Sequence, residues 1–167
     1  MSDAGFRFRP VIRRDGALLR RWLADARVAR WFDEPDYARV ILEEHLKDPR
    51  LRVWMVEQDG QPLAYLQDYD IHGFKDHPLA FLPQGARGVD TFIGTSAQMG
   101  QGRGPAYLRA FCARCFAQGC PAMGIDPHPD NRAAIRAYEK AGFRPGEVCE
   151  TEWGPALLMN CWPTPEA

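Results

Sequence analysis

The sequence of 167 residues has no long apolar run and no apolar core behind its first charges. Its hydrophobic stretches, such as 53–56 and 156–159, are far shorter than the roughly 20 residues that cross a bilayer. A signal peptide would need an apolar segment near the N-terminus. We therefore expect no membrane partner and no targeting segment.

Cysteine is scarce and odd in number, which argues against a disulfide scaffold. Of the five cysteines, Cys112, Cys115 and Cys120 fall in one predicted helix and the turn after it. No histidine or second cysteine pair stands at a zinc-site spacing. We expect reduced thiols in a cytoplasmic protein and no metal site.

An excess of positive charge is also missing, since the formal net charge is −1. This excludes a globally basic nucleic-acid binder. Residues 101–144, however, carry seven Lys or Arg against three acids, whereas 145–167 carry four Glu and no basic residue. One stretch favours an anionic ligand and the other a cationic one, although a solvated surface would fit the same pattern.

Hydrophobic periodicity predicts the elements of the N-terminal half. We expect a strand over 6–12, a helix after Asp15 as N-cap, and a second helix over 36–47. An Asp-Gly turn between two β-rich runs predicts a hairpin over 51–70. The loop over 71–88 is long enough to suggest a functional role.

The second half alternates between strands and helices. Strands are predicted at 89–94 and 121–126, and helices at 106–118 and 131–141, with Gly142 ending the second helix. Two strands close the chain, at 146–152 and 156–161. This order predicts a parallel pair with a right-handed crossover. We expect an α/β fold with a mixed central sheet flanked by helices, in a single domain over 1–167.

The stretch "QMGQGRGP" (98–105) precedes a predicted helix and holds three glycines. The first N–H groups of a helix are unpaired and the helix dipole is positive there, so anions bind at such ends. Glycines at 100, 102 and 104 leave room for a phosphate, and Pro105 suits the first helical turn. The stretch fits neither the Walker loop nor G-x-G-x-x-G. Alone, it fits a phosphate cradle and a plain helix cap equally well.

The stretch "NRAAIRAYEKAGF" (131–143) adds a second motif after the next strand. Together the two resemble the GNAT superfamily of acetyl-coenzyme A-dependent N-acetyltransferases, whose signature is R/Q-x-x-G-x-G/A followed by N-x-x-A-x-x-x-Y-x-x-x-G-F. Asn131, Ala134 and Tyr138 fall at the signature positions. Met99 departs from the pattern, because it stands where the loop usually has Arg or Gln.

Four stretches, "RGVD", "AQMGQGRG", "IDPHPDNRAAIRAYEKAGF" and "GPALLM", look like those of bacterial aminoglycoside 6′-N-acetyltransferases. The resemblance implies a GNAT-like fold with splayed parallel strands, acetyl-coenzyme A as co-substrate, and a monomer or homodimer. It implies transfer of an acetyl group to a primary amine of a cationic small molecule, the 6′-amine of an aminoglycoside antibiotic, and hence antibiotic resistance. Two alternatives stay open: another amine as acceptor, such as a siderophore precursor, a metabolite or a protein N-terminus, and a non-catalytic coenzyme A-binding module.

The resemblance also implies the site residues. Tyr138 would protonate the leaving thiolate, although a core tyrosine is the alternative. Asp90 would act as the base or hold the amine, while Asp126, or a water relay, is an alternative base and Asp126 also suits a turn starter. The expected cofactor residues are Thr91, Phe92, Ile93, Gln98, Met99, Gly100, Gln101, Gly102, Arg103, Gly104, Pro105, Asn131, Ala134, Arg136 and Tyr138. The expected substrate residues are Trp31, Asp33, Glu34, Asp68, Asp76, Asp90 and Asp126.

Two departures concern the acceptor. The stretch 77–85 lacks a dense acidic run, and Trp153 stands where the resembled enzymes lead us to expect an acid. Both bear on the identity of the amine and not on acetyl transfer.

Overall fold

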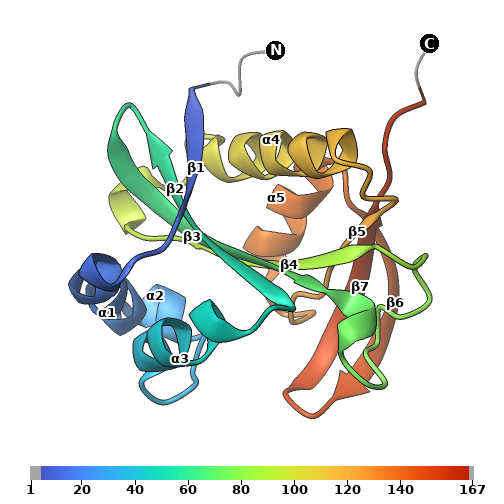
Figure 1. Ribbon diagram of the computed structural model, residues 1–167, viewed down its shortest axis with the longest axis horizontal. Coiled ribbons are helices and arrows are strands. Elements are labelled where there is room, and N and C mark those ends of the chain that lie inside the picture. The colour runs from blue at the N-terminus through green and yellow to red at the C-terminus, as the bar shows by residue number, and fades with distance from the viewer. Residues whose placement is uncertain (1–4, 166–167) are drawn as a thin grey trace. The chain divides into compact units, whose positions relative to one another are not determined.

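The computed structural model describes residues 5–165 (Figure 1). Its helices and strands follow in the order β1 Phe6–Pro10, α1 Gly16–Ala24, α2 Ala26–Ala29, α3 Tyr37–Glu43, β2 Leu51–Gln58, β3 Gln61–Asp70, β4 Arg87–Ile93, α4 Arg103–Ala117, β5 Met123–Ile125, α5 Arg132–Ala141, β6 Arg144–Thr151 and β7 Gly154–Cys161. Short 3₁₀ turns occur at 13–15, 45–47, 71–73 and 96–98. The strands pair in the order β1-β2-β3-β4-β5-β7-β6. The predicted α/β fold with a mixed sheet is confirmed.

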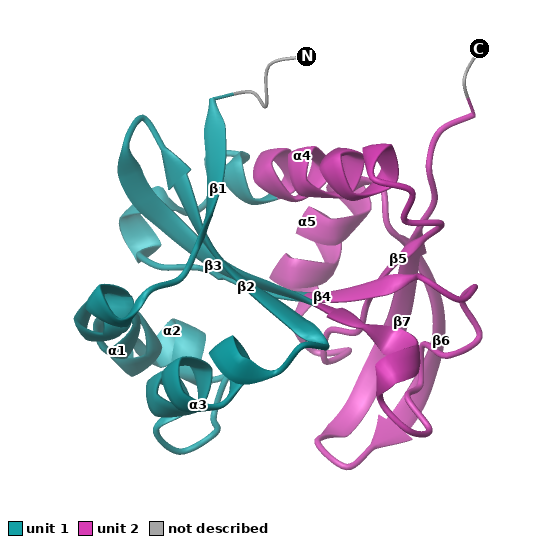
Figure 2. Ribbon diagram, in the orientation of Figure 1, with its two compact units in different colours: residues 1–68, 90–104 teal, residues 69–89, 105–167 magenta. Residues whose placement is uncertain are grey.

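The chain divides into two compact units, coloured in Figure 2. Unit 1 comprises residues 1–68 and 90–104, and unit 2 comprises residues 69–89 and 105–167. Both units are discontinuous in sequence. Strands β3 and β4 and helix α4 each contribute residues to both.

The core of unit 1 lies between its strands and helices α1 to α3. Trp22 of α1 and Ile41 of α3 are buried together with Met55 of β2. Phe92 of β4 packs edge-on to the ring of Trp22 at 6.4 Å and stacks on Tyr65 of β3 at 5.2 Å. One apolar face of the strands is therefore closed by helices, and polar groups on that face are withdrawn from water.

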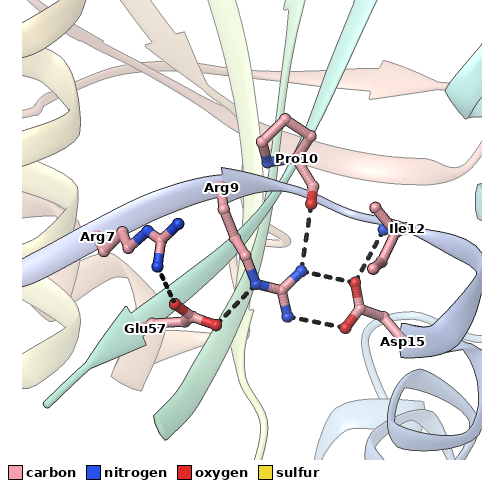
Figure 3. A network of polar contacts seen from close by, with 6 residues as sticks. All are labelled: Arg7, Arg9, Pro10, Ile12, Asp15 and Glu57. Carbon is pink, nitrogen blue, oxygen red and sulfur yellow. Dashed lines mark hydrogen bonds and ion pairs between the residues drawn. The ribbon is translucent and has the colours of Figure 1, made fainter. Parts of the chain in front are cut away.

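A buried ion-pair network joins β1 and β2 to the start of α1 (Figure 3). The guanidinium of Arg9 donates two hydrogen bonds of 2.8 Å to the carboxylate of Asp15 and one of 2.7 Å to Glu57. Asp15 also accepts from the backbone N–H of Ile12. Burial raises the pKa of Asp15, but the bonds from Arg9 and Ile12 outweigh it and the pKa is lowered. Asp15 stands at the N-cap position of α1, as predicted, but its side chain makes no cap hydrogen bond to this helix.

Unit 2 contains the parallel pair and the closing hairpin. Strands β4 and β5 run parallel, with Arg87 opposite Met123 and Gly88 opposite Gly124. Strand β7 pairs antiparallel with both β5 and β6. The expected parallel crossover is confirmed, and α5 ends as predicted at Gly142 in a left-handed conformation.

The boundaries of several elements differ from the sequence prediction. Helix α4 begins at Arg103, three residues before the expected start, so the last glycine of the loop lies inside it. The helix expected over 36–47 is shorter and ends in a 3₁₀ turn. Helix α2 was not predicted, because four residues carry too little periodicity. None of the helices within 5–165 has both the length and the apolar character needed to cross a bilayer.

Replacing Gly94 with Ala should destabilise the protein. A Cβ at this position would lie 2.1 Å from the ring of Trp22, which is itself buried. Overpacking of this kind costs about 1–3 kcal/mol. We expect Gly94→Ala to lower the free energy of unfolding by that amount in urea denaturation.

Gly104→Ala is the matched control. Its Cβ would meet only Ile93, at an ordinary contact distance of 3.5 Å. Equal stability of the two variants would contradict the proposed clash.

Candidate active site

Asp90 lies on β4 and is half-buried on the face that helices α1 to α3 cover. Side chains of a strand alternate between its two faces, so Asp90 shares this face with Phe92. Its carboxylate accepts a hydrogen bond of 2.8 Å from the side-chain amide of Gln67 on β3. The side chain of the predicted base, Asp90, is thus anchored to the neighbouring strand.

Gln67 is held in turn by three groups around its carbonyl oxygen. The hydroxyl of Tyr65 donates to it at 2.6 Å and that of Tyr37 at 3.3 Å, while Nδ1 of His45 lies at 3.1 Å. With donors on the oxygen, the NH₂ group must face Asp90. This cluster of five polar side chains, which we call the Gln67 network, therefore orients Asp90.

Burial and the Gln67 network shift the pKa of Asp90 in opposite directions. Burial raises its pKa above the ordinary value of 3.8, whereas the bond from Gln67 and the charge of His45 act in the opposite direction. The pKa values of Tyr37 and Tyr65 are raised, chiefly by burial, so both hydroxyls stay protonated donors at neutral pH. A carboxylate with a raised pKa beside fixed donors is suited to accept a proton.

Sequence reasoning missed the other members of this network. Their spacing did hold a signal, since Tyr65 and Gln67 are two residues apart on one strand and share a face. Tyr37 and His45 come from α3 and the 3₁₀ turn after it. No local motif connects these helical residues to β3.

Asp68 occupies a different position from the one expected. Its side chain is fully buried. Oδ2 of the carboxylate accepts two hydrogen bonds from the guanidinium of Arg52, at 2.6 and 2.9 Å, and Oδ1 accepts one from the indole N–H of Trp54 at 2.7 Å. As the neighbour of Gln67 on β3, it points to the opposite face of the strand. This placement argues against the predicted contact of Asp68 with substrate. The pair has a structural task, because removal of Arg52 would leave a buried carboxylate without its cation.

The three predicted cofactor residues of β4 are built into the sheet. The hydroxyl of Thr91 donates to the carbonyl of Tyr65 at 2.6 Å, and Phe92 belongs to the core. Ile93 is half-buried beside Gly104. A contribution of Thr91 and Phe92 to cofactor binding therefore has to come from their backbone.

The glycine loop has the open geometry that a phosphate requires. Gly100 and Gly102 have positive φ angles of 72° and 73°, and a Cβ on either would meet no atom within 4 Å. The loop leads into the 15-residue helix α4, whose first N–H groups lack helical partners. The residues present thus fit the diphosphate of coenzyme A.

The loop's glutamines bond to the loop itself. Gln98 accepts from the hydroxyl of Thr95 at 2.9 Å, and Gln101 donates to the carbonyl of Ala97 at 3.1 Å. Arg103 opens α4 and Pro105 follows in its first turn. Met99 is one-third exposed.

In unit 2, the second motif forms α5. Asn131 caps this helix by accepting from the N–H of Ala134 at 3.3 Å, so its side chain has a structural task. Arg136 is exposed, and Tyr138 is half-buried with its ring 6.4 Å from that of Phe143. The local arrangement places these residues along one helix, as the motif predicts.

The other predicted substrate residues are distributed over both units. In unit 1, Asp33 and Glu34 are exposed, and Arg30 covers the ring of half-buried Trp31 at 4.6 Å. In unit 2, Asp76 is exposed with a φ of 56° and Asp126 is half-buried after β5. Trp153 is 82% exposed in the turn between β6 and β7.

Comparisons with known proteins agree with this arrangement. The chain is 29% identical to the aminoglycoside N(6′)-acetyltransferase type 1 of Klebsiella pneumoniae over an alignment of 167 positions. The alignment covers 95% of this chain and 83% of the relative. It is 38% identical to a kanamycin resistance protein of Rhizobium radiobacter over 76 residues, or 45% of this chain and 70% of the relative. The aminoglycoside acetyltransferase AAC(6′)-Ib, solved with coenzyme A and kanamycin, superposes with a TM-score of 0.85 at 29% identity, covering 94% of both chains. The profile of the acetyltransferase (GNAT) domain matches residues 11–151.

A match that spans most of the chain establishes the family, and the fold and the glycine loop are consistent with it. The chain belongs to the GNAT acetyltransferase family.

Proposed function

We propose that this protein is an acetyl-coenzyme A-dependent N-acetyltransferase that acetylates the 6′-amine of an aminoglycoside. The observation that carries the proposal is the likeness to AAC(6′)-Ib, whose structures contain coenzyme A with kanamycin or acetyl-coenzyme A with paromomycin. This likeness extends over more than nine-tenths of both chains. The family match over 11–151 includes residues of both units, which supports a single acetyltransferase domain over the whole chain.

The glycine loop and the start of α4 are the proposed seat of the cofactor. The backbone N–H groups from about Gly100 to Ala106, apart from Pro105, are the proposed ligands, since a Cβ at Gly100 or Gly102 would meet no atom within 4 Å. When bound, acetyl-coenzyme A supplies an activated acetyl thioester. Since acetyl-coenzyme A is a cytoplasmic metabolite, the reaction is proposed to take place in the cytoplasm, with the protein as a monomer or homodimer.

Asp90 is the proposed base. An ammonium group cannot attack a carbonyl carbon, so the amine has to lose a proton first. The carboxylate of Asp90 is oriented by Gln67 and has a raised pKa, so it holds the cationic amine and accepts its proton. Tyr138 is the proposed acid, because a phenol is protonated at neutral pH and donates to the leaving thiolate.

The proposed acceptor carries several ammonium groups, which acidic side chains attract. Trp31, Asp33 and Glu34 of unit 1 and Asp76 and Asp126 of unit 2 are the proposed contacts. Asp68 is left out, because Arg52 already neutralises it.

The acceptor is tested by thiol release. We expect kanamycin to release coenzyme A and to yield a product acetylated at the 6′-amine, located by NMR. Paromomycin, which has a hydroxyl at this position, is the matched control and should release little thiol. Turnover of spermidine or a protein N-terminus without turnover of kanamycin would move the activity to another amine, and thiol release with none of them would leave a coenzyme A-binding module.

The role of Asp90 is tested by the pH dependence of kcat/KM. A base works only when deprotonated, so activity should fall as the pH drops through its raised pKa. Gln67→Leu removes a donor that lowers this pKa, so the acid limb should move to higher pH. Asp90→Asn should lower kcat about 100-fold or more and abolish the limb.

Gln61→Leu is the matched control, since Gln61 is exposed at the start of the same strand. It should leave the profile unchanged. A limb that persists in Asp90→Asn at the wild-type position would assign the proton transfer to another group.

The role of Tyr138 is tested by Tyr138→Phe. Without a proton donor, the thiolate is a poorer leaving group, so kcat should fall at least about 10-fold while the Kd of coenzyme A changes little. Thermal melting checks that the variant is folded. Unchanged kcat would exclude the acid role and leave Tyr138 as a core residue.

A further inference from the structure

Two nitrogen atoms of the Arg27 guanidinium have no hydrogen-bond acceptor within the described residues. Arg27 lies in α2 of unit 1, and its side chain is 29% exposed. Its Nε and Nη2 atoms are nevertheless buried and have no hydrogen-bond partner within the described residues. Buried polar groups are nearly always hydrogen-bonded, so this exception needs an explanation.

The neighbours of Arg27 do not satisfy it. Oδ1 of Asp25 lies 3.7 Å from Nε, which is too far for a hydrogen bond, and the same oxygen accepts from the backbone N–H of Arg27 at 2.9 Å. Nη1 lies against the sulfur of Met99. A thioether is only a weak acceptor, and Asp25 is an ion-pair partner of Nε without a hydrogen bond. Within the described residues, Nε and Nη2 therefore have no hydrogen-bond acceptor.

The two unsatisfied atoms form a recognisable binding edge. The N–H of Nε and one N–H of Nη2 point in the same direction from the guanidinium plane. This is the fork that binds two oxygens of a carboxylate or phosphate at once. A buried N–H group without an acceptor is costly, so an anion at this edge would stabilise the folded protein.

The contact with Met99 indicates which anion this is. Met99 belongs to the glycine loop, next to Gly100, and both lie in unit 1 with Arg27. Met99 is also the position at which the sequence departs from the Arg or Gln of the family signature. The side-chain N–H donor that the signature has at position 99 is thus present beside the loop, on another element.

We propose that Arg27 is a ligand of the coenzyme A diphosphate and replaces, from α2, the side-chain contact that Met99 cannot make. The proposal rests on the proposed function, since it assumes that the glycine loop holds this cofactor. The sulfur of Met99 contacts Nη1, which leaves the Nε and Nη2 edge as the part of the guanidinium that would bind the diphosphate. The backbone N–H groups of the loop and the Arg27 fork then share the charge of the diphosphate.

The test is the Kd of two ligands, measured by titration calorimetry without an acceptor amine. Coenzyme A carries a diphosphate and a 3′-phosphate, and dephospho-coenzyme A carries only the diphosphate. We expect Arg27→Met to weaken both ligands equally, by about 10-fold or more, because a charge-assisted pair is lost. Arg27→Lys should recover part of the affinity.

Two further variants separate charge from packing. Arg21→Met, at an exposed arginine of α1, is the matched control and should leave both Kd values unchanged. Met99→Ala should keep or raise the affinity, since it frees Nη1 of Arg27 and leaves the Nε and Nη2 edge in place. Thermal melting confirms folding of each variant.

Several results would overturn the proposal. Unchanged affinity in Arg27→Met would exclude a contact. Weaker binding of coenzyme A alone would assign Arg27 to the 3′-phosphate, and equal losses in Met99→Ala and Arg27→Met would show a packing role. Coenzyme A binding without aminoglycoside turnover would leave the inference standing while the proposed function fails, whereas absence of binding by the unmodified protein would end both.

Discussion

A carboxylate that lies between a sheet and its covering helices has to keep a partner, and in this protein the hydrogen bond from Gln67 to Asp90 meets that requirement. The bond orients the carboxylate of Asp90 only because the side chain of Gln67 cannot rotate. Its carbonyl oxygen is engaged by Tyr37, Tyr65 and His45, which come from α3, β3 and the turn after α3. The proposed base is therefore positioned by the packing of the helices on the sheet, and its pKa depends on that same packing.

Unit 1 deals with charge in three ways, and the contrast separates structural from functional groups. Asp15 and Asp68 are paired with Arg9 and Arg52, and these pairs hold elements together. Asp90 is hydrogen-bonded to Gln67 but has no cationic side chain bonded to it among residues 5–165, which suits a group that receives a proton. Two buried nitrogens of Arg27 lack a hydrogen-bond acceptor in the same range, which suits a group that binds an anionic ligand.

Three residues that the sequence predicts as site residues also have structural partners in the protein. Asp68 looked equivalent to other acids near the end of β3, but a shift of one residue along a strand moves a side chain to the other face. Asn131 matches the cofactor signature, yet its side chain caps α5. Gln98 likewise bonds within the loop, to Thr95. In each case the residue type suits a ligand, and the side chain also bonds to another group of the protein: side chains for Asp68 and Gln98, and a backbone N–H for Asn131.

The sequence by itself determined the features that contiguous residues encode. The strand and helix periodicities, the Asp-Gly hairpin, the glycine loop and the α5 motif each depend on backbone geometry within a few residues, so the fold class and family were predictable. Only the tertiary structure decided which side chains meet across the fold. Gln67 bonds to Asp90 across 23 residues, and Arg27 contacts Met99 across 72. Strand pairing and helix packing create these contacts, and no short-range pattern records them.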